Sequence, residues 1–217
     1  INWKMFKIMA ELVEGFEFLT GIVHAVTVLG TRSIKRESEF FEIAYQTGFK
    51  LAKEGFTVVT GGGTGIMEAA NQGAFDANGE SIGISYKVSY KDKINQYVKK
   101  SISFTYPFTR KFVLLAPSEG FLFFPGGFGT MHELFELLTL RETGKMPNLP
   151  IALIGSEYWN GLMYFIKHNI FEKQHAISET DLSIFKIFDS VDEAVAFIGG
   201  ENHPPKGSLG QEKSWQG

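Results

Sequence analysis

Apolar residues along the chain form short continuous runs, separated by longer segments in which they recur at helical spacing. The runs "VHAVTVLG", "FTVVTGGG", "SIGIS", "FLFF" and "PIALIG" do not alternate with polar residues, which is typical of strands buried on both faces. The amphipathic segments between them tend to end near glycine. Buried strands that alternate with helices predict an α/β fold, a Rossmann-like doubly wound parallel sheet flanked by helices in a single domain.

The same pattern sets the expected element boundaries. Strands are predicted over residues 23–30, 56–63, 81–85, 121–124, 150–155 and near 183–188. Helices are predicted over residues 1–19, 37–55, 65–79, 105–120, 130–144, 157–171 and near 190–199. We therefore divide the chain into an N-terminal helical segment (1–22), the Rossmann-like domain (23–199) and a mobile C-terminal tail (200–217). The polar stretch 87–101 is expected to be a mobile loop near a site.

Composition narrows the classes of function. The chain has 217 residues, 44% of them hydrophobic, no cysteine and a formal net charge of -3. The absence of cysteine excludes disulfides and thiolate catalysis, and it fits a reducing compartment, so we expect a cytoplasmic protein. The charge balance and the lack of a Lys/Arg block argue against nucleic acid or a membrane as partner. No apolar run approaches the length of a membrane-spanning helix.

Three predicted strands end in unusual sequences, "VLGTRS" (28–33), "VVTGGGTGIME" (58–68) and "FFPGGFGTMHE" (123–133). Carboxyl ends of parallel strands meet at one edge of a sheet, where exposed backbone N–H groups and helix N-termini attract anions. Each glycine-rich join can also be only a tight turn, but two of them in one sheet favour a phosphate site. Neither matches a P-loop or a dinucleotide fingerprint, so the phosphate belongs to a smaller ligand.

Charged residues near these joins suggest chemistry. We place Glu133 in the first turn of its helix, where the helix dipole favours the ionised carboxylate. It either complements the dipole or stabilises the oxocarbenium charge that develops when a glycosidic bond breaks. Arg110 and Lys111 are predicted to open another helix, where cations oppose the dipole. They are either a solvated basic pair or the partners of an anion or acid.

Taken together, "GGGTGIMEAANQGA", "TRK" and "PGGFGTMHE" resemble the LONELY GUY (LOG) phosphoribohydrolase family, formerly labelled as possible lysine decarboxylases, over about residues 26–199. The N-terminal helix and "TVLGTRS" resemble the longer bacterial branch of the family. The resemblance implies hydrolysis of the N-glycosidic bond of a nucleoside 5′-monophosphate to free base and ribose 5-phosphate. It implies Arg110 and Glu133 as the catalytic pair. The substrate-binding positions that it implies are Gly30, Arg32, Gly61, Gly62, Gly63, Gly65, Met67, Glu68, Lys111, Pro125, Gly126, Gly127, Gly129, Thr130, His132 and Thr139.

Two positions depart from the family pattern. His132 stands where many members carry an acidic residue, and Thr31 replaces a common serine, so the contacts to ribose or base differ. Cytokinin nucleotides and AMP-like nucleotides, the substrates of an AMP nucleosidase, both stay open. Lysine decarboxylation is disfavoured because it needs a Schiff-base lysine and a phosphopyridine site.

The resemblance also bears on partners and on the alternatives to an enzyme. It implies a homodimer, or a higher assembly, and no cofactor. The histidine spacing gives no metal site. A carrier of a phosphorylated ligand and an oligomeric scaffold remain as the alternatives to catalysis.

Overall fold

The computed structural model describes residues 3–87 and 94–200, so the expected tail beyond residue 200 and much of the expected loop 87–101 lie outside the described residues. Its strands are β1 Ala25–Leu29, β2 Thr57–Thr60, β3 Ser81–Tyr86, β4 Lys100–Phe104, β5 Ser118–Phe123, β6 Ile151–Ile154 and β7 Phe185–Phe188. Its α-helices are α1 Trp3–Leu19, α2 Glu39–Lys53, α3 Ile66–Asp76, α4 Pro107–Leu115, α5 Phe128–Glu142, α6 Ser156–Phe165 and α7 Val191–Ile198.

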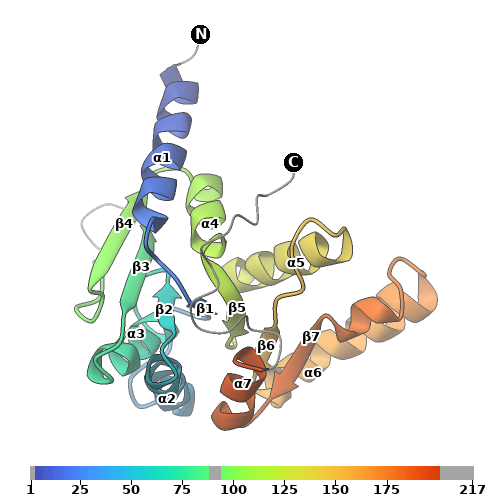
Figure 1. The fold of residues 1–217 in the computed structure, drawn as a ribbon. Helices are drawn as coiled ribbons and strands as arrows, with labels where there is room; N and C mark the ends of the chain where they lie inside the picture. Colours follow the sequence, from blue (N-terminus) through green and yellow to red (C-terminus); the bar gives the residue numbers. More distant parts are fainter. Residues whose placement is uncertain (1–2, 88–93, 201–217) are drawn as a thin grey trace.

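The seven strands form one sheet in the order β4-β3-β2-β1-β5-β6-β7, and every neighbouring pair is parallel. The chain runs outward from β1 to β4 on one side, then returns to the centre with β5 and continues outward the other way (Figure 1). The doubly wound sheet in one domain is therefore confirmed. The reversal of strand order lies between β1 and β5, which is where open α/β sheets place their ligands.

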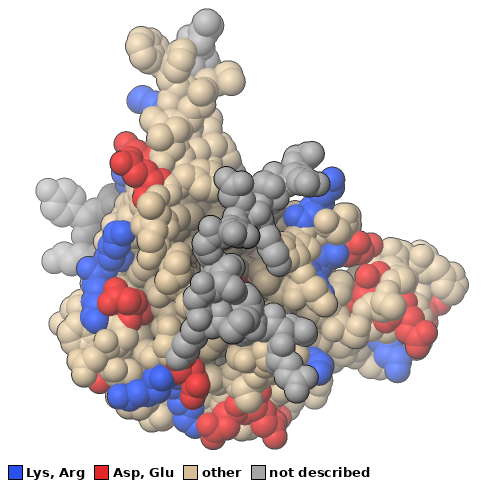
Figure 2. All heavy atoms as spheres, viewed as in Figure 1, with Lys and Arg blue, Asp and Glu red and all other residues tan. Residues whose placement is uncertain are grey.

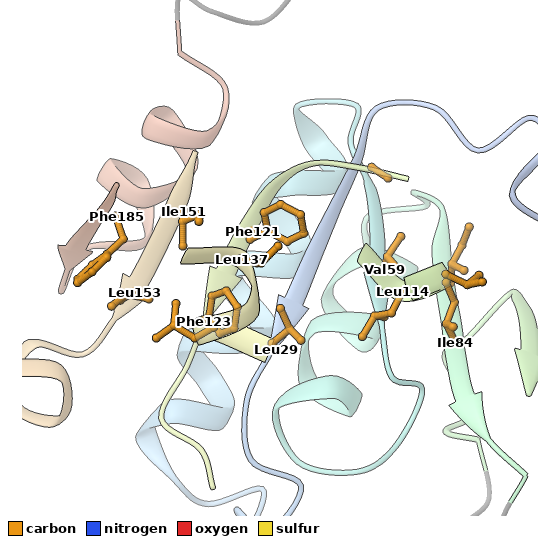
Figure 3. Packing of buried hydrophobic residues seen from close by; sticks show 14 of the residues in the cluster. Leu29, Val59, Ile84, Leu114, Phe121, Phe123, Leu137, Ile151, Leu153 and Phe185 are labelled. Atoms are coloured by element: carbon orange, nitrogen blue, oxygen red, sulfur yellow. The ribbon is translucent and has the colours of Figure 1, made fainter. Parts of the chain in front are cut away.

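Helices cover both faces of the sheet, and each face has its own hydrophobic core. One core joins the sheet to α4, α5 and α6. Figure 3 shows Leu137 of α5 beside Phe121 and Phe123 of β5, and Leu114 of α4 near Val59 of β2 and Ile84 of β3. The other core joins the sheet to α2, α3 and α7. Strand β5 supplies Leu122 to this second core, so its side chains are buried on both sides, as its sequence predicts.

Two local expectations were wrong, and one predicted helix changes type along its length. The predicted loop 87–101 overlaps β4, an edge strand that the polar sequence "KSISF" concealed. The helix predicted over 105–120 ends at Leu115, and β5 already begins at Ser118. The helix after β6 continues as a π-helix, η1, over Ile166–Lys173.

Helix α1 extends from the body of the molecule and contacts it along α4 and β4 (Figure 1). Positive and negative side chains are interspersed over the face drawn in Figure 2, and the end of α1 is largely uncharged there. Within the described ranges, no helix is long and apolar enough to cross a membrane.

Candidate active site

The loops that follow β1 and β5 are joined by backbone hydrogen bonds. The N–H of Phe124 donates to the carbonyl of Leu29 at 2.8 Å, and the N–H of Thr31 donates to the carbonyl of Pro125 at 3.0 Å. The Thr31 carbonyl in turn accepts from the N–H of Ile66, the first residue of α3, at 3.1 Å. The three unusual strand ends therefore meet at one edge of the sheet, where the sequence places them.

The loop after β2 is held by the amide side chains of Asn95, which is partly buried, and Asn71. The Asn95 side chain donates to the Gly63 carbonyl at 2.9 Å and to the Asn71 side-chain oxygen at 3.0 Å, and the Asn95 N–H donates to Gly62 at 2.9 Å. Asn71 is fully buried and also bonds Thr60 at 2.6 Å and Ser81 at 2.9 Å. The position of the Gly61–Gly65 loop is thus fixed by the protein itself. Met67 lies against this loop from the first turn of α3.

The loop after β5 is open. Gly127 and Gly129 are exposed, and a Cβ atom added at either would meet no atom within 4 Å. Phe128 between them is 96% exposed. Gly126 and Thr130 are in close contact, and Thr130 is buried, so the loop turns tightly into α5. This arrangement leaves room in front of the N-terminus of α5, where backbone N–H groups can bind an anion.

Arg110 and Glu133 form an ion pair at 2.7 Å between the Arg110 Nη1 and the Glu133 Oε1. Both side chains are largely buried, with exposed fractions of 8% and 14%. The Arg110 Nε donates to the carbonyl of Ile84 at 2.8 Å, and the guanidinium lies 4.8 Å from the centre of the Tyr86 ring. The acid partner that the sequence suggested for Arg110 is therefore Glu133.

Burial raises the pKa of the Glu133 carboxyl above its ordinary value of 4.5, and the lowering by Arg110, Lys111 and His132 does not cancel that effect. The expected dipole effect does not account for this carboxylate, because α5 begins at Phe128 and Glu133 lies in its second turn. Arg110 is likewise one turn into α4 rather than at its start. A carboxyl with a raised pKa next to a fixed cation is suited to proton transfer or to charge stabilisation.

A second polar cluster lies beside this pair. The Lys111 Nζ is 2.9 Å from the Glu136 Oε2 and 3.2 Å from the His132 Nε2. Lys111 and His132 were both predicted site residues, and the structure brings them together. Glu136 was not predicted, although its position one helical turn after His132 on the sequence is a usable signal.

The remaining predicted positions do not all lie at the loops that follow β1, β2 and β5. Glu68, in the first turn of α3, is paired with Arg36, which also contacts the Tyr97 hydroxyl at 3.4 Å. Gly30 packs on Ile66 at the start of α3, and Arg32 is exposed in the same loop region. Thr139 is not brought to the loops. Its hydroxyl donates to Phe135 on the exposed surface of α5, and at about 1.5 Å per residue it lies roughly 15 Å along the helix from Gly129.

Several residues that shape the site were missed by sequence reasoning. Asn71, Asn95 and Ile84 act through the loop or the arginine that they hold, and such contacts cross elements that are distant in sequence. The motif "AANQGA" contains Asn71, so its polar residue inside an apolar helix face was the available signal. Within residues 3–87 and 94–200, no group of three His, Asp or Glu side chains could hold a metal ion.

Two family models match this sequence. One, described as "Possible lysine decarboxylase", matches residues 67–198, well over half of the chain. The other, described as "DNA recombination-mediator protein A", matches residues 16–100. The first begins at Met67, just after the loop that follows β2, and it covers the loop after β5 together with Arg110 and Glu133.

Curated relatives include a cytokinin riboside 5′-monophosphate phosphoribohydrolase, LOG1, of Arabidopsis thaliana. It is 28% identical over 179 residues, which cover 81% of this chain and 82% of that protein. A probable cytokinin riboside 5′-monophosphate phosphoribohydrolase of Oryza sativa subsp. japonica is 27% identical over 142 residues, or 63% of this chain and 65% of that protein.

Solved structures with the same fold include the molybdenum cofactor carrier protein of Chlamydomonas reinhardtii. Its TM-score is 0.62 at 21% identity, over 80% of this chain and 94% of that one. The molybdenum cofactor binding protein of Rippkaea orientalis has a TM-score of 0.61 at 22% identity, over 81% and 93% of the two chains. At this level of identity the likeness establishes the fold.

Proposed function

The chain belongs to the LOG family, and on that premise we propose that it is a nucleotide N-glycosidase that releases free base and ribose 5-phosphate from a nucleoside 5′-monophosphate. The observation that carries the proposal is the buried Arg110–Glu133 pair on α4 and α5, with the open glycine loop at the start of the same α5 helix. A phosphate bound at the helix start and a carboxylate one turn further along are what this cleavage requires.

The residues have distinct roles in this proposal. Backbone N–H groups of Gly127, Gly129 and Thr130 bind the 5′-phosphate in front of α5, and the loop after β2 closes its other side. When the C1′–N bond breaks, the bonding electron pair leaves with the base, which takes up a proton from solvent water. The ionised Glu133 stabilises the positive charge at C1′ and then accepts a proton from the water that bonds to this carbon. Arg110 holds Glu133 in place and keeps its pKa from rising further.

The proposal is tested by incubating purified protein with AMP, GMP, CMP and isopentenyl-AMP and measuring free base by HPLC. We expect release by the wild type and a loss of about 10²–10⁴-fold in Glu133→Gln, which keeps the size of the side chain. Glu142→Gln on the exposed end of α5 is the matched control and retains full activity. If the wild type releases no base from any nucleotide, the proposed activity is wrong.

A second candidate is a carrier of a phosphorylated ligand. It is favoured by the shared fold of the two molybdenum cofactor proteins, and it would use the glycine loops alone. The buried carboxylate argues against it, because a carboxylate beside a phosphate weakens binding unless it acts on another part of the ligand. Ligands that raise the melting temperature without being cleaved would support the carrier.

The finer features of the proposal are the substrate range, the assembly and the compartment. Adenine nucleotides and cytokinin nucleotides are the two substrate classes that the HPLC panel separates.

We further propose a homodimer and a cytoplasmic location. Exposed phenylalanines on α4, Phe108 and Phe112, supply apolar surface for such a contact. Analytical ultracentrifugation tests the assembly, and a monomer at micromolar concentration would rule out the dimer.

A further inference from the structure

Helix α1 carries a buried carboxylate, Glu11, which is only 6% exposed. Its oxygens accept hydrogen bonds from the backbone N–H of Thr105 at 2.7 Å, from the N–H of Tyr106 at 3.2 Å and from the Thr109 hydroxyl at 2.8 Å. Burial opposes the ionisation of Glu11, but these three donors outweigh it and lower its pKa. The carboxylate is therefore charged at neutral pH.

The donors all belong to the beginning of α4. This helix starts at Pro107, and the residue before it, Tyr106, has no side chain that can cap the exposed N–H groups. The carboxylate of Glu11 satisfies N–H groups at this end and complements the positive end of the helix dipole. Glu11 is thus a cap supplied by another helix.

The capped helix is the one that carries Arg110. Thr109, which bonds Glu11, directly precedes Arg110, and both are buried. The Arg110 side chain must reach Ile84 at 2.8 Å and Glu133 at 2.7 Å. A shift of the first turn of α4 would therefore change both of these bonds.

The contact between α1 and α4 is close along its length. Gly15, one turn after Glu11, has no room for a side chain, since an added Cβ would lie 2.5 Å from Val113 of α4. The rings of Phe16 and Phe112 meet edge to face with centroids 5.7 Å apart. Beside this contact, the Nζ of Lys100 in β4 donates to the carbonyl of Phe18 in α1 at 3.3 Å. These contacts hold Glu11 in place against the start of α4.

We propose that Glu11 is a positioning residue for Arg110, so that α1 is part of the catalytic machinery although it lies outside the matched family region 67–198. The expected effect on catalysis rests on the proposed glycosidase function. The claim that Glu11 sets the geometry of Arg110 is structural and is independent of that function. Nucleotide binding by the glycine loops does not involve α1, so we expect kcat to respond rather than KM.

The experiment compares Glu11→Ala with Glu14→Ala, which removes an exposed carboxylate from the same helix. One readout is steady-state kinetics with its pH profile. The other is the ¹⁵N NMR signal of the Arg110 Nε–Hε group, whose proton is protected from exchange with water by the hydrogen bond to Ile84. The signal is assigned by its absence from the spectrum of Arg110→Lys. We expect Glu11→Ala to lower kcat about ten- to a hundredfold with little change in KM, and to shift the Nε–Hε signal.

In Glu11→Ala the acid limb of the pH profile also moves to higher pH, because Glu133 loses part of the lowering by Arg110. Glu14→Ala should match the wild type in every readout. If Glu11→Ala fails to fold, Glu11→Gln, which keeps the shape and one acceptor, provides the same readouts. An Nε–Hε signal and kcat that match the wild type in the folded Glu11 variant would overturn the inference. If the wild type cleaves no nucleotide, the proposed function fails, and the NMR signal alone still decides whether Glu11 positions Arg110.

Discussion

The loops after β2 and β5 are both rich in glycine, yet the glycines differ in what requires them. In the first loop Gly62 and Gly65 have φ angles of +71° and +70°, and a Cβ at Gly65 would lie 2.5 Å from the Thr31 carbonyl oxygen. In the second loop Gly127 and Gly129 have no positive φ and face open space. The first set is explained by the packing of the chain, whereas neither packing nor a positive φ explains the second.

This difference separates two meanings of a glycine motif. A glycine that the fold requires says little about ligands, whereas a glycine without a conformational or packing reason points to one. In the proposed site, the loop after β2 would form a fixed wall and the loop after β5 the surface that contacts the phosphate. Substitutions that act on folding in one loop and on binding in the other would test this division.

The largest effect is expected from Gly65→Ala. The positive φ and the clash with Thr31 together should lower the free energy of unfolding by about 3 kcal/mol, measured by urea denaturation of the ligand-free protein. Gly144→Ala is the control, because Gly144 has a φ of +66° and no atom within 4 Å of an added Cβ, so it should lose only about 1 kcal/mol. Equal losses at both positions would show that the clash contributes nothing.

The next largest effect is expected from Asn71→Ala, which removes the buried hydrogen bonds that support the loop after β2. Its side chain bonds Thr60, Ser81 and Asn95 without exposure to water, so we expect a loss of about 2 kcal/mol in the free energy of unfolding. Gln72→Ala is the matched control, because the side-chain oxygen of Gln72 has no hydrogen-bond partner in the described part of the chain. If Asn71→Ala is as stable as the control, the loop is not held by this network.

A smaller effect, and one confined to binding, is expected from Gly129→Ala. Gly129 is the second residue of α5, so alanine should leave the free energy of unfolding unchanged or raise it by up to about 1 kcal/mol. The new methyl group occupies the space in front of the helix and should weaken ribose 5-phosphate about tenfold, or roughly 1.4 kcal/mol, by isothermal titration calorimetry. Unchanged affinity would place the phosphate elsewhere.

The smallest effect concerns the carboxyl beside the open loop. Folding raises the pKa of Glu133, so protonated Glu133 adds to the stability of the folded protein below pH 4.5. This added stability is lost as the pH rises through the raised pKa. The free energy of unfolding of the wild type relative to Glu133→Gln should therefore fall with increasing pH across this interval. A difference that rises with pH would mean that Arg110, rather than burial, dominates the environment of Glu133.

The sheet could be predicted from the sequence because its central strands are apolar throughout, and the glycine-rich joins could be placed at one edge because parallel strands end together. Strand β4 was missed since an edge strand with exposed lysine and serine lacks that signal. Arg110 and Glu133 could be named as candidates from the sequence, but the ion pair between them depends on how two helices lie in space. Glu11 was out of reach, because it caps a helix whose nearest bonded residue, Thr105, is 94 positions away.

The bonds that link the strand ends at the site run from main chain to main chain, from Phe124 to Leu29, from Thr31 to Pro125 and from Ile66 to Thr31. Because these hydrogen bonds join only backbone groups, they do not depend on the identity of most side chains in the loops. Mutation can therefore exchange the residues around the opening, Phe128 among them, while the frame that holds them is inherited unchanged. Substitutions around the opening could therefore change what the proposed site accepts, while the hydrogen-bonded arrangement of the strand ends stays the same.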